Sequence, residues 1–229
     1  MGWRSGNVQP HDRRLGWLVV LGGLLMSAAA ARAADVEARE YGIYIDNKPA
    51  GTYHLHMVVA DDGKTTVRAN ADVRYRVLIY HYTYTFRGTE VWKNGRLIRL
   101  DSTANDDGKK FMVHAEPADG NLRVTVNGNT ATLPGDVWTT TAWQKPAARY
   151  HNHTLPMIDA DTGRHLSGRL EYVDKRDIPV GDSAVACEHY RVTGGTQMEL
   201  YFDRHHRLVR QETVEQGHAT VLQLRGIQR

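Results

Sequence analysis

Apolar and polar residues alternate along most of this 229-residue chain with a period of two. The clearest segment is residues 66–77, in which every second residue from Val67 to Val77 is apolar, while Thr, Asn, Asp and Arg fill the positions between them. Successive side chains of a β-strand point to opposite faces of its sheet, so this pattern predicts a strand with one buried and one solvated face. We find no amphipathic helical pattern of similar clarity, and the sequence therefore predicts antiparallel β-structure.

Short runs of Asp, Asn and Gly separate the alternating segments. Such residues tolerate the positive φ angles that tight hairpins require. The runs lie at residues 61–64, 94–95, 106–108, 119–121, 127–128 and 194–195. They delimit about twelve expected strands, at residues 41–46, 52–60, 65–78, 80–92, 97–104, 109–116, 122–126, 168–175, 184–193, 196–203, 207–215 and 218–225. Many strands at this spacing predict an all-β fold, built as a strongly curved antiparallel sheet, either a barrel or a barrel-like half-barrel.

Residues 133–165 interrupt this rhythm. The segment contains three of the seven prolines together with Trp138 and Trp143, and it shows little alternation. We expect one long loop that crosses the sheet, because connections of this length are functional or disordered and the tryptophans argue against disorder. The two tryptophans either plug an open end of the sheet or form a lid over a ligand cavity.

Four aromatic residues occupy alternate positions of one expected strand and therefore share a face: Tyr80, Tyr82, Tyr84 and Phe86. Four rings in line bury a large apolar area, which is typical of a core. The same rings would form the wall of an apolar cavity if the curved sheet were incompletely filled.

Residues 1–33 have the pattern of a secretory signal peptide. Arg4, Arg13 and Arg14 make the segment positive, residues 15–26 are largely apolar, and residues 31–33 form an Ala-x-Ala cleavage site. The apolar run is shorter than the roughly 20 residues that a membrane-spanning helix needs. We therefore expect cleavage near Ala33, a single antiparallel β domain at residues 34–229 that does not span a membrane, and a periplasmic or secreted location.

Charge and cysteine content narrow the function classes. Residues 1–33 hold four of the 29 Lys and Arg residues and one of the 26 Asp and Glu residues, so the remainder carries 25 of each. A neutral chain lacks the basic character of nucleic-acid-binding proteins, and we expect no nucleic-acid partner. Cys187 is the only cysteine, so the fold has no internal disulfide and depends on its core.

The histidines suggest one metal site. His54 and His56 would share a strand face and could chelate an ion with a third ligand from another strand or from the long loop. The alternative places both imidazoles on the solvated face of an ordinary strand, because the residues between and around them are apolar.

Two short patterns resemble fragments of nucleophilic sites. Cys187 and His189 would share a strand face, and Ser183 precedes Asp203 and His206 in the order seen in Gly-Asp-Ser hydrolases. The spacing and the β context fit those hydrolases poorly, and an unpaired cysteine is most often a small core residue. We predict no catalytic residue and no cofactor.

The segment Glu90–Leu97, followed by Ser102–Lys109, resembles the centre of an uncharacterised family of exported bacterial β-proteins, a domain of unknown function. The resemblance spans roughly residues 41–225 and rests on turn and packing elements, which imply relatives and no chemistry. The segment Tyr201–Asp203, with the Leu-Val-Arg that follows the turn, is also similar to the end of curved-sheet envelope proteins of the lipoprotein-carrier kind.

Three functions remain open at this point. The first is a non-enzymatic periplasmic carrier, whose curved sheet encloses an apolar cavity for a lipid-like or amphipathic small molecule. The second is an envelope interaction or assembly protein with a solid core, whose edge or charged face meets an envelope protein through Arg68, Arg74 and Arg76. The third is periplasmic metal binding through His54 and His56.

Overall fold

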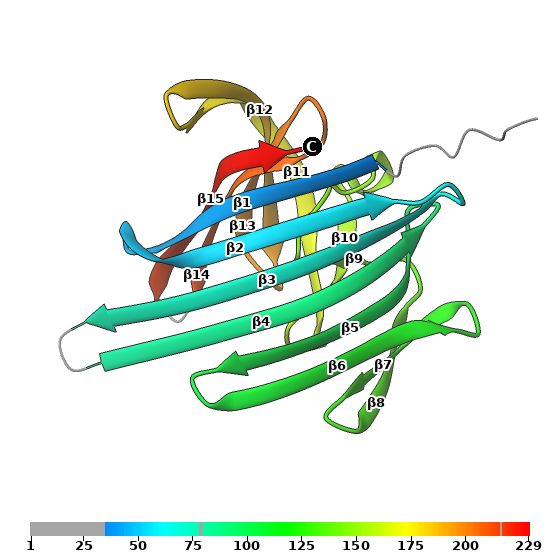
Figure 1. Cartoon of the computed structure of the whole chain (residues 1–229). Coiled ribbons are helices and arrows are strands. Elements are labelled where there is room, and N and C mark those ends of the chain that lie inside the picture. The colour runs from blue at the N-terminus through cyan, green and yellow to red at the C-terminus, as the bar shows by residue number, and fades with distance from the viewer. Residues whose placement is uncertain (1–34, 78–79, 216) are drawn as a thin grey trace, which may run out of the picture. The chain divides into compact units, whose positions relative to one another are not determined.

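The computed structural model describes residues 35–77, 80–215 and 217–229. All strands in this part belong to one 15-stranded sheet, and its only helix is a short 3-10 turn, η1, at Ala148–Tyr150 (Figure 1). The strands are β1 Asp35–Ile45, β2 Lys48–Val59, β3 Lys64–Val77, β4 Tyr80–Lys93, β5 Arg96–Asp106, β6 Lys109–Ala118, β7 Asn121–Val126, β8 Asn129–Pro134, β9 Trp138–Thr139, β10 Thr154–Ile158, β11 His165–Val180, β12 Ser183–Gly194, β13 Met198–Asp203, β14 Leu208–Glu215 and β15 His218–Gln228. The predicted all-β, strongly curved antiparallel sheet is confirmed.

Local sequence explains the hairpins. Two-residue turns join β1 to β2 and each consecutive pair from β4 to β8, and both residues of every such turn have positive φ, as at Asn94 (52°) and Gly95 (72°). This conformation matches the twist of the flanking strands and favours Asn, Asp and Gly. Asp-Gly and Asn-Gly pairs therefore specify four of these turns, and Asp46-Asn47 forms the turn between β1 and β2.

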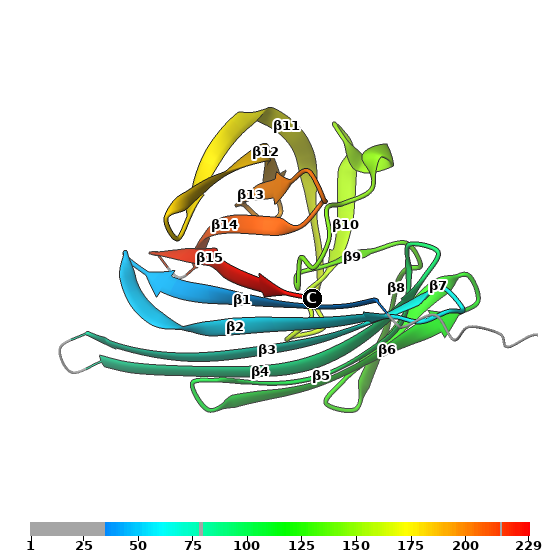
Figure 2. The same cartoon turned by 45° about the horizontal axis from the view of Figure 1, so that its top comes forward.

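The strand order is that of a continuous meander with one exception. Neighbours in sequence are neighbours in the sheet, except that β8 and β9 lie at its two opposite edges while β1 pairs with β15 in the middle. All pairings are antiparallel except the short contact of β9 with β10. The sheet rolls so that β11–β14 lie across from β3–β6 (Figure 2). The result is a half-barrel whose open seam lies between β8 and β9.

All twelve expected strands are present, and the structure adds β8, β9 and β10. Two of the additions lie inside residues 133–165, where the sequence predicted one long loop. β9 has only two residues and β10 contains Pro156, so neither shows the alternation that reveals a strand.

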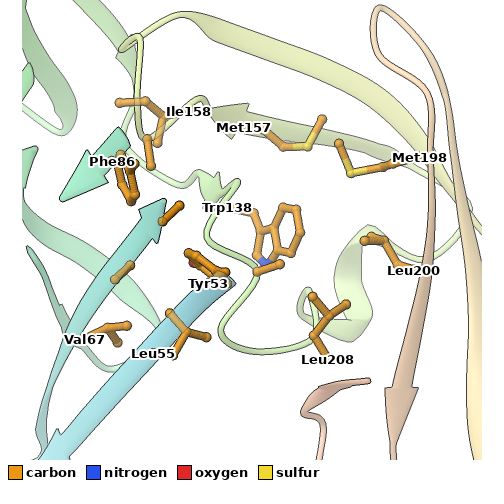
Figure 3. Close-up of a cluster of buried hydrophobic side chains, with 14 of the residues drawn as sticks. Tyr53, Leu55, Val67, Phe86, Trp138, Met157, Ile158, Met198, Leu200 and Leu208 are labelled. Atoms are coloured by element: carbon orange, nitrogen blue, oxygen red, sulfur yellow. The ribbon is translucent and has the colours of Figure 1, made fainter. Parts of the chain in front are cut away.

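The core is one cluster that lies inside the curve of the sheet. It joins the alternate residues of β1–β6 to those of β10–β14, with residues of the 133–165 segment between them. Trp138 occupies the middle of this interior, between Tyr53 and Leu55 on one side and Leu200 and Leu208 on the other (Figure 3). The crossing segment thus fills the half-barrel from within.

Two further observations concern the ends of the chain. The predicted signal peptide lies outside the described residues, so its cleavage stays a prediction. In the part of the chain that the structure describes, no helix has the length and apolar character needed to cross a membrane.

Candidate functional site

The expected cavity wall lies on the inner face of β4. Phe86 is buried, whereas Tyr82 and Tyr84 are half-buried and use their hydroxyl groups. The Tyr82 hydroxyl donates to Asp106 Oδ1 at 2.8 Å, and the Tyr84 hydroxyl donates to Asp161 Oδ2 at 2.8 Å. These rings therefore pack against the core and anchor polar groups. The side chain of Tyr80 lies outside the described part of the molecule.

The two expected lid residues sit on the segment that fills the interior. Trp138 is 5% exposed, and its Nε1 donates to the backbone oxygen of Gln144 at 2.9 Å. Trp143 packs against Trp92 with ring centroids 5.8 Å apart, and its buried Nε1 finds no partner among the described residues. In this conformation Trp138 is a central core residue.

Polar side chains of the sheet hold the crossing segment in place. The Tyr53 hydroxyl donates to the backbone oxygen of Thr141 at 3.0 Å, and Arg39 Nη1 donates to that of Trp143 at 2.5 Å. Ser102 Oγ donates to the backbone oxygen of Ala160 at 2.5 Å. Each contact satisfies a carbonyl that burial would otherwise leave without a partner, which is costly in a protein interior.

Glu90 is the most unusual member of this interior. It lies on the inner face of β4, is 1% exposed, and accepts hydrogen bonds at Oε2 from Trp92 Nε1 at 2.7 Å and Thr139 Oγ1 at 3.1 Å. Its other oxygen, Oε1, is buried and has no partner among the described residues. Burial disfavours the charged form and raises the pKa of Glu90 to about 7.

A second acidic centre lies where the crossing segment turns into β11. The side chains of Asp159 and Asp161 interact, and burial, followed by the neighbouring Asp159, raises the pKa of Asp161 well above its ordinary value. Thr162 Oγ1 donates to Asp159 at 2.5 Å, while Tyr84 holds Asp161. Burial beside a second carboxyl therefore favours the protonated form of Asp161.

Perturbed carboxyls of this kind mark candidate catalytic sites, but catalysis also needs access for a substrate. Two open hollows on the surface of the described chain lie elsewhere, and neither is lined by Glu90 or Asp161. The interior carboxyls therefore fit the role of buried anchors for the crossing segment.

His54 and His56 lie on the outer face of β2. His54 is exposed and pairs in register with Glu40 and Asn70, and His56 is half-buried beside Ala38 and Arg68. Among the residues that the structure describes, no group of three His, Cys, Asp or Glu side chains is placed to hold a metal ion. The third ligand that the metal hypothesis requires is thus not assembled on the described face.

The same outer face carries a polar surface that extends from β2 to β6. We call it the outer polar face. It comprises His54, His56, Arg68, Asp72, Arg74, Arg76, His81, Thr85, Arg87, Asp101, Thr103, Met112 and His114.

A hollow of about 420 Å³ lies on this face, over β4, β5 and β6. Its lining includes Arg87, Thr103 and Met112, and Met112 is 66% exposed. The position of the Arg87 guanidinium is fixed by two hydrogen bonds, because it donates to the backbone oxygen of Ala71 at 2.9 Å and to Asp72 at 2.8 Å. The face therefore offers an exposed apolar side chain next to a fixed guanidinium.

The acidic groups of the outer polar face already have cationic partners, whereas several of its arginines do not. Asp72 pairs with Arg87, and Asp101 accepts from His114 Nδ1 at 2.7 Å and pairs with Arg99. Arg68 and Arg74 make no ion pair with any residue that the structure describes, and Arg76 Nε donates to His81 Nδ1 at 3.1 Å. The arginines singled out from the sequence thus give this face an uncompensated positive charge.

Sequence reasoning missed Glu90, Asp161 and Met112. Glu90 was detectable, because it occupies the apolar register of β4 between Phe86 and Trp92. Asp161 was hidden in an expected loop. Met112 stands in the outward register of an expected strand, where a single apolar residue is common and carries no signal.

Comparisons with known proteins agree with this fold. The model of a family described as Domain of unknown function (DUF6134) matches residues 41–225. None of the curated proteins matches the chain. A solved structure described as a beta-barrel-like protein of domain of unknown function DUF1849, from Brucella abortus, is similar with a TM-score of 0.61 and 12% identity, over 84% of this chain and 96% of that chain. At this identity the likeness shows the fold alone.

Proposed function

The chain belongs to the DUF6134 domain family, and from this premise we propose that it is an exported interaction protein that binds an acidic envelope protein through its outer polar face. The observation that carries the proposal is the contrast between the two sides of the sheet. The inner side is occupied by the chain's own crossing segment, whereas the outer side carries an exposed methionine on β6 and, on β3, the arginines Arg68 and Arg74 that lack an ion-pair partner among the described residues. Carriage of a lipid-like molecule would require the crossing segment to leave the interior.

The composition of the face fits a protein partner. Interfaces are enriched in Met and Arg relative to the rest of a protein surface. Met112 would enter an apolar depression of the partner, beside the Arg87 guanidinium that Asp72 holds in place. Arg68 and Arg74 would add long-range attraction for an acidic surface, which raises the association rate and favours one partner over others.

The area of the outer polar face indicates whether the complex should be stable or transient. Five strands at about 4.8 Å spacing and the residues from Arg68 to Arg76 at about 3.3 Å rise give an area of roughly 19 by 26 Å, or about 500 Å². A stable interface buries about 800 Å² on each partner, so this face alone corresponds to a transient complex. Affinity should therefore depend strongly on salt, because much of it comes from exposed charges.

The test is site-specific photocrosslinking of the full chain in its native cells, followed by measurement with the purified partner. A photoreactive residue at Thr85, on the outer polar face, should crosslink one acidic protein. The same residue at Ser183, at a distant hairpin, should not crosslink it. The purified partner should bind the full chain, with an affinity that falls as salt concentration rises.

Charge reversal supplies the matched comparison. The double change Arg68→Glu and Arg74→Glu should abolish the crosslink and the binding. The double change Arg96→Glu and Arg123→Glu, at exposed arginines elsewhere, should preserve both. An unchanged crosslink in the first variant, or a Thr85 crosslink to lipid or polysaccharide in place of an acidic protein, would overturn the proposal.

A further inference from the structure

A second hollow, of about 190 Å³, lies on the wall of the half-barrel opposite the outer polar face. It is formed by β11, β12 and the turn that joins β13 to β14. Its lining residues are Lys175, Ala186, Cys187, Glu188, Asp203, Arg204 and His206. The hollow thus brings cationic and anionic side chains from three parts of the chain together.

Both carboxylates of the hollow are already neutralised by residues outside its lining. Glu188 Oε2 accepts from Lys145 Nζ at 2.7 Å and from the Tyr190 hydroxyl at 3.1 Å, and the bond from Lys145 holds the pKa of Glu188 below its ordinary value. Asp203 pairs with Arg207 Nη2 at 2.6 Å. Each acid thus has a cationic partner outside the lining, and Glu188 also attracts Lys175, which lies opposite it on β11.

The two cations of the lining have no such partner. Lys175 makes no ion pair with any residue in the described part of the chain, and neither does Arg204. Arg204 Nε donates to His205 Nε2 at 3.0 Å, which leaves its terminal nitrogens available. Four cations around the hollow, Lys145, Lys175, Arg204 and Arg207, stand against three acids, Asp177, Glu188 and Asp203, and Arg204 keeps unused donors.

The turn that carries Arg204 and His206 has a fixed backbone. The Asp203 carboxylate accepts from the backbone N–H groups of His205 at 2.8 Å and Arg207 at 2.9 Å. The backbone of His206 donates to the Asp203 oxygen at 2.9 Å, and the backbone of Lys145 donates to the His206 oxygen at 3.0 Å. A turn held at this many points presents its side chains with little entropy left to lose on binding.

We propose that this hollow binds the phosphate group of a small molecule or lipid headgroup. The Arg204 guanidinium offers the planar fork that matches two phosphate oxygens, and Lys175 supplies a second, mobile charge. His206 lies in the same lining and adds an imidazole nitrogen. A volume of about 190 Å³ is several times the roughly 30 Å³ that one water occupies, which leaves room for a phosphate group.

Cys187 takes no chemical part in this site. Its Sγ donates to the backbone oxygen of Val185 at 3.3 Å, and burial raises the pKa of the thiol to about 12. The neutral thiol is a poor nucleophile, so the hollow binds its ligand without forming a bond to it.

Calorimetric titration of the full chain with inorganic phosphate tests the proposal. Phosphate should bind with one saturable site. Combined Lys175→Gln and Arg204→Gln changes should weaken binding at least about tenfold, because each removes a charge-assisted hydrogen bond. The matched control combines Lys93→Gln and Arg96→Gln, two exposed cations of the β4–β5 hairpin, and should leave the affinity unchanged.

A second titration identifies the source of the phosphate group. Glycerol phosphate and phosphatidylcholine vesicles that contain phosphatidic acid should both compete with inorganic phosphate at the same site. Tighter binding of glycerol phosphate would identify a small molecule as the ligand, and tighter binding of the vesicles would identify a lipid headgroup. Absence of saturable phosphate binding would overturn the proposal. Equal weakening in both double variants would overturn it as well, because it would show attraction by general charge alone.

Discussion

Replacement of Glu90 by Gln tests whether a buried, proton-binding carboxyl anchors the crossing segment. Gln retains the shape of the side chain and an oxygen that accepts from Trp92 and Thr139. It cannot ionise, and its amide occupies the position of the partnerless Oε1. The change therefore removes the response to pH while largely preserving the packing.

The size of the stability change follows from the pKa of the Glu90 carboxyl in the unfolded and in the folded chain. Its pKa rises from 4.5 to about 7 on folding, so the folded chain binds this proton more tightly than the unfolded chain. The stability that the proton provides is complete below pH 4.5, declines as pH rises to 7, and is lost above that. The loss is about 3 kcal/mol for this group. Relative to the wild type, Glu90→Gln should gain about that much between pH 4.5 and pH 8.

Urea unfolding of the full chain, followed by tryptophan fluorescence at several pH values, measures this difference. The comparison cancels the parallel contribution of Asp161, which both proteins retain. Glu40→Gln, at an exposed position of β1, is the matched control and should differ from the wild type by the same small amount at every pH. A Glu90→Gln difference that is flat between pH 4.5 and pH 8 would refute the reasoning.

Three further changes probe the interior. Trp138→Ala should destabilise the chain by about 3–5 kcal/mol in urea unfolding, because the ring is a central part of the core; a loss below 1 kcal/mol would contradict that placement. Gly51→Ala would put a Cβ 2.0 Å from the backbone oxygen of Asp72 and should lower the thermal midpoint severely, whereas Gly226→Ala, with open space around it, should not. Cys187 should resist iodoacetamide at pH 8 until the chain unfolds, because its thiol is buried and its pKa is about 12; rapid modification of the folded chain would disprove this.

Strands with one buried and one solvent-exposed face could be predicted from the sequence, because apolar and polar residues must alternate along them. Residues 66–77 illustrate this: Val67, Ala69, Ala71 and Val73 are buried as the alternation requires. β10 was missed because it is short and its consecutive residues Met157 and Ile158 are both fully buried, so both faces of the strand are covered at that end. A strand buried in this way loses its alternation.

For the candidate surfaces too, the sequence predicts some features and only the tertiary structure shows the others. Arg68, Arg74 and Arg76 could be assigned to an outer face, because register alone places them opposite buried residues. The hollow near Met112 depends on which strands lie beside β6, and the cationic hollow depends on a turn that meets two strands from elsewhere in the chain. Contacts of this kind are set by strand order and by the curvature of the sheet, which no local pattern contains.

Local sequence was sufficient for the class of fold, for most strands and turns, and for the side of the sheet on which each residue lies, because those properties follow from backbone sterics and from a short-range period. The family was also recognisable from turn and packing residues spread along the chain. Only the rolled sheet decided that the crossing segment fills the interior, that Glu90 and Asp161 are buried with it, and that both hollows lie elsewhere. The physical reason is that desolvation and packing depend on which distant residues come together, and the closure of the half-barrel brings them together.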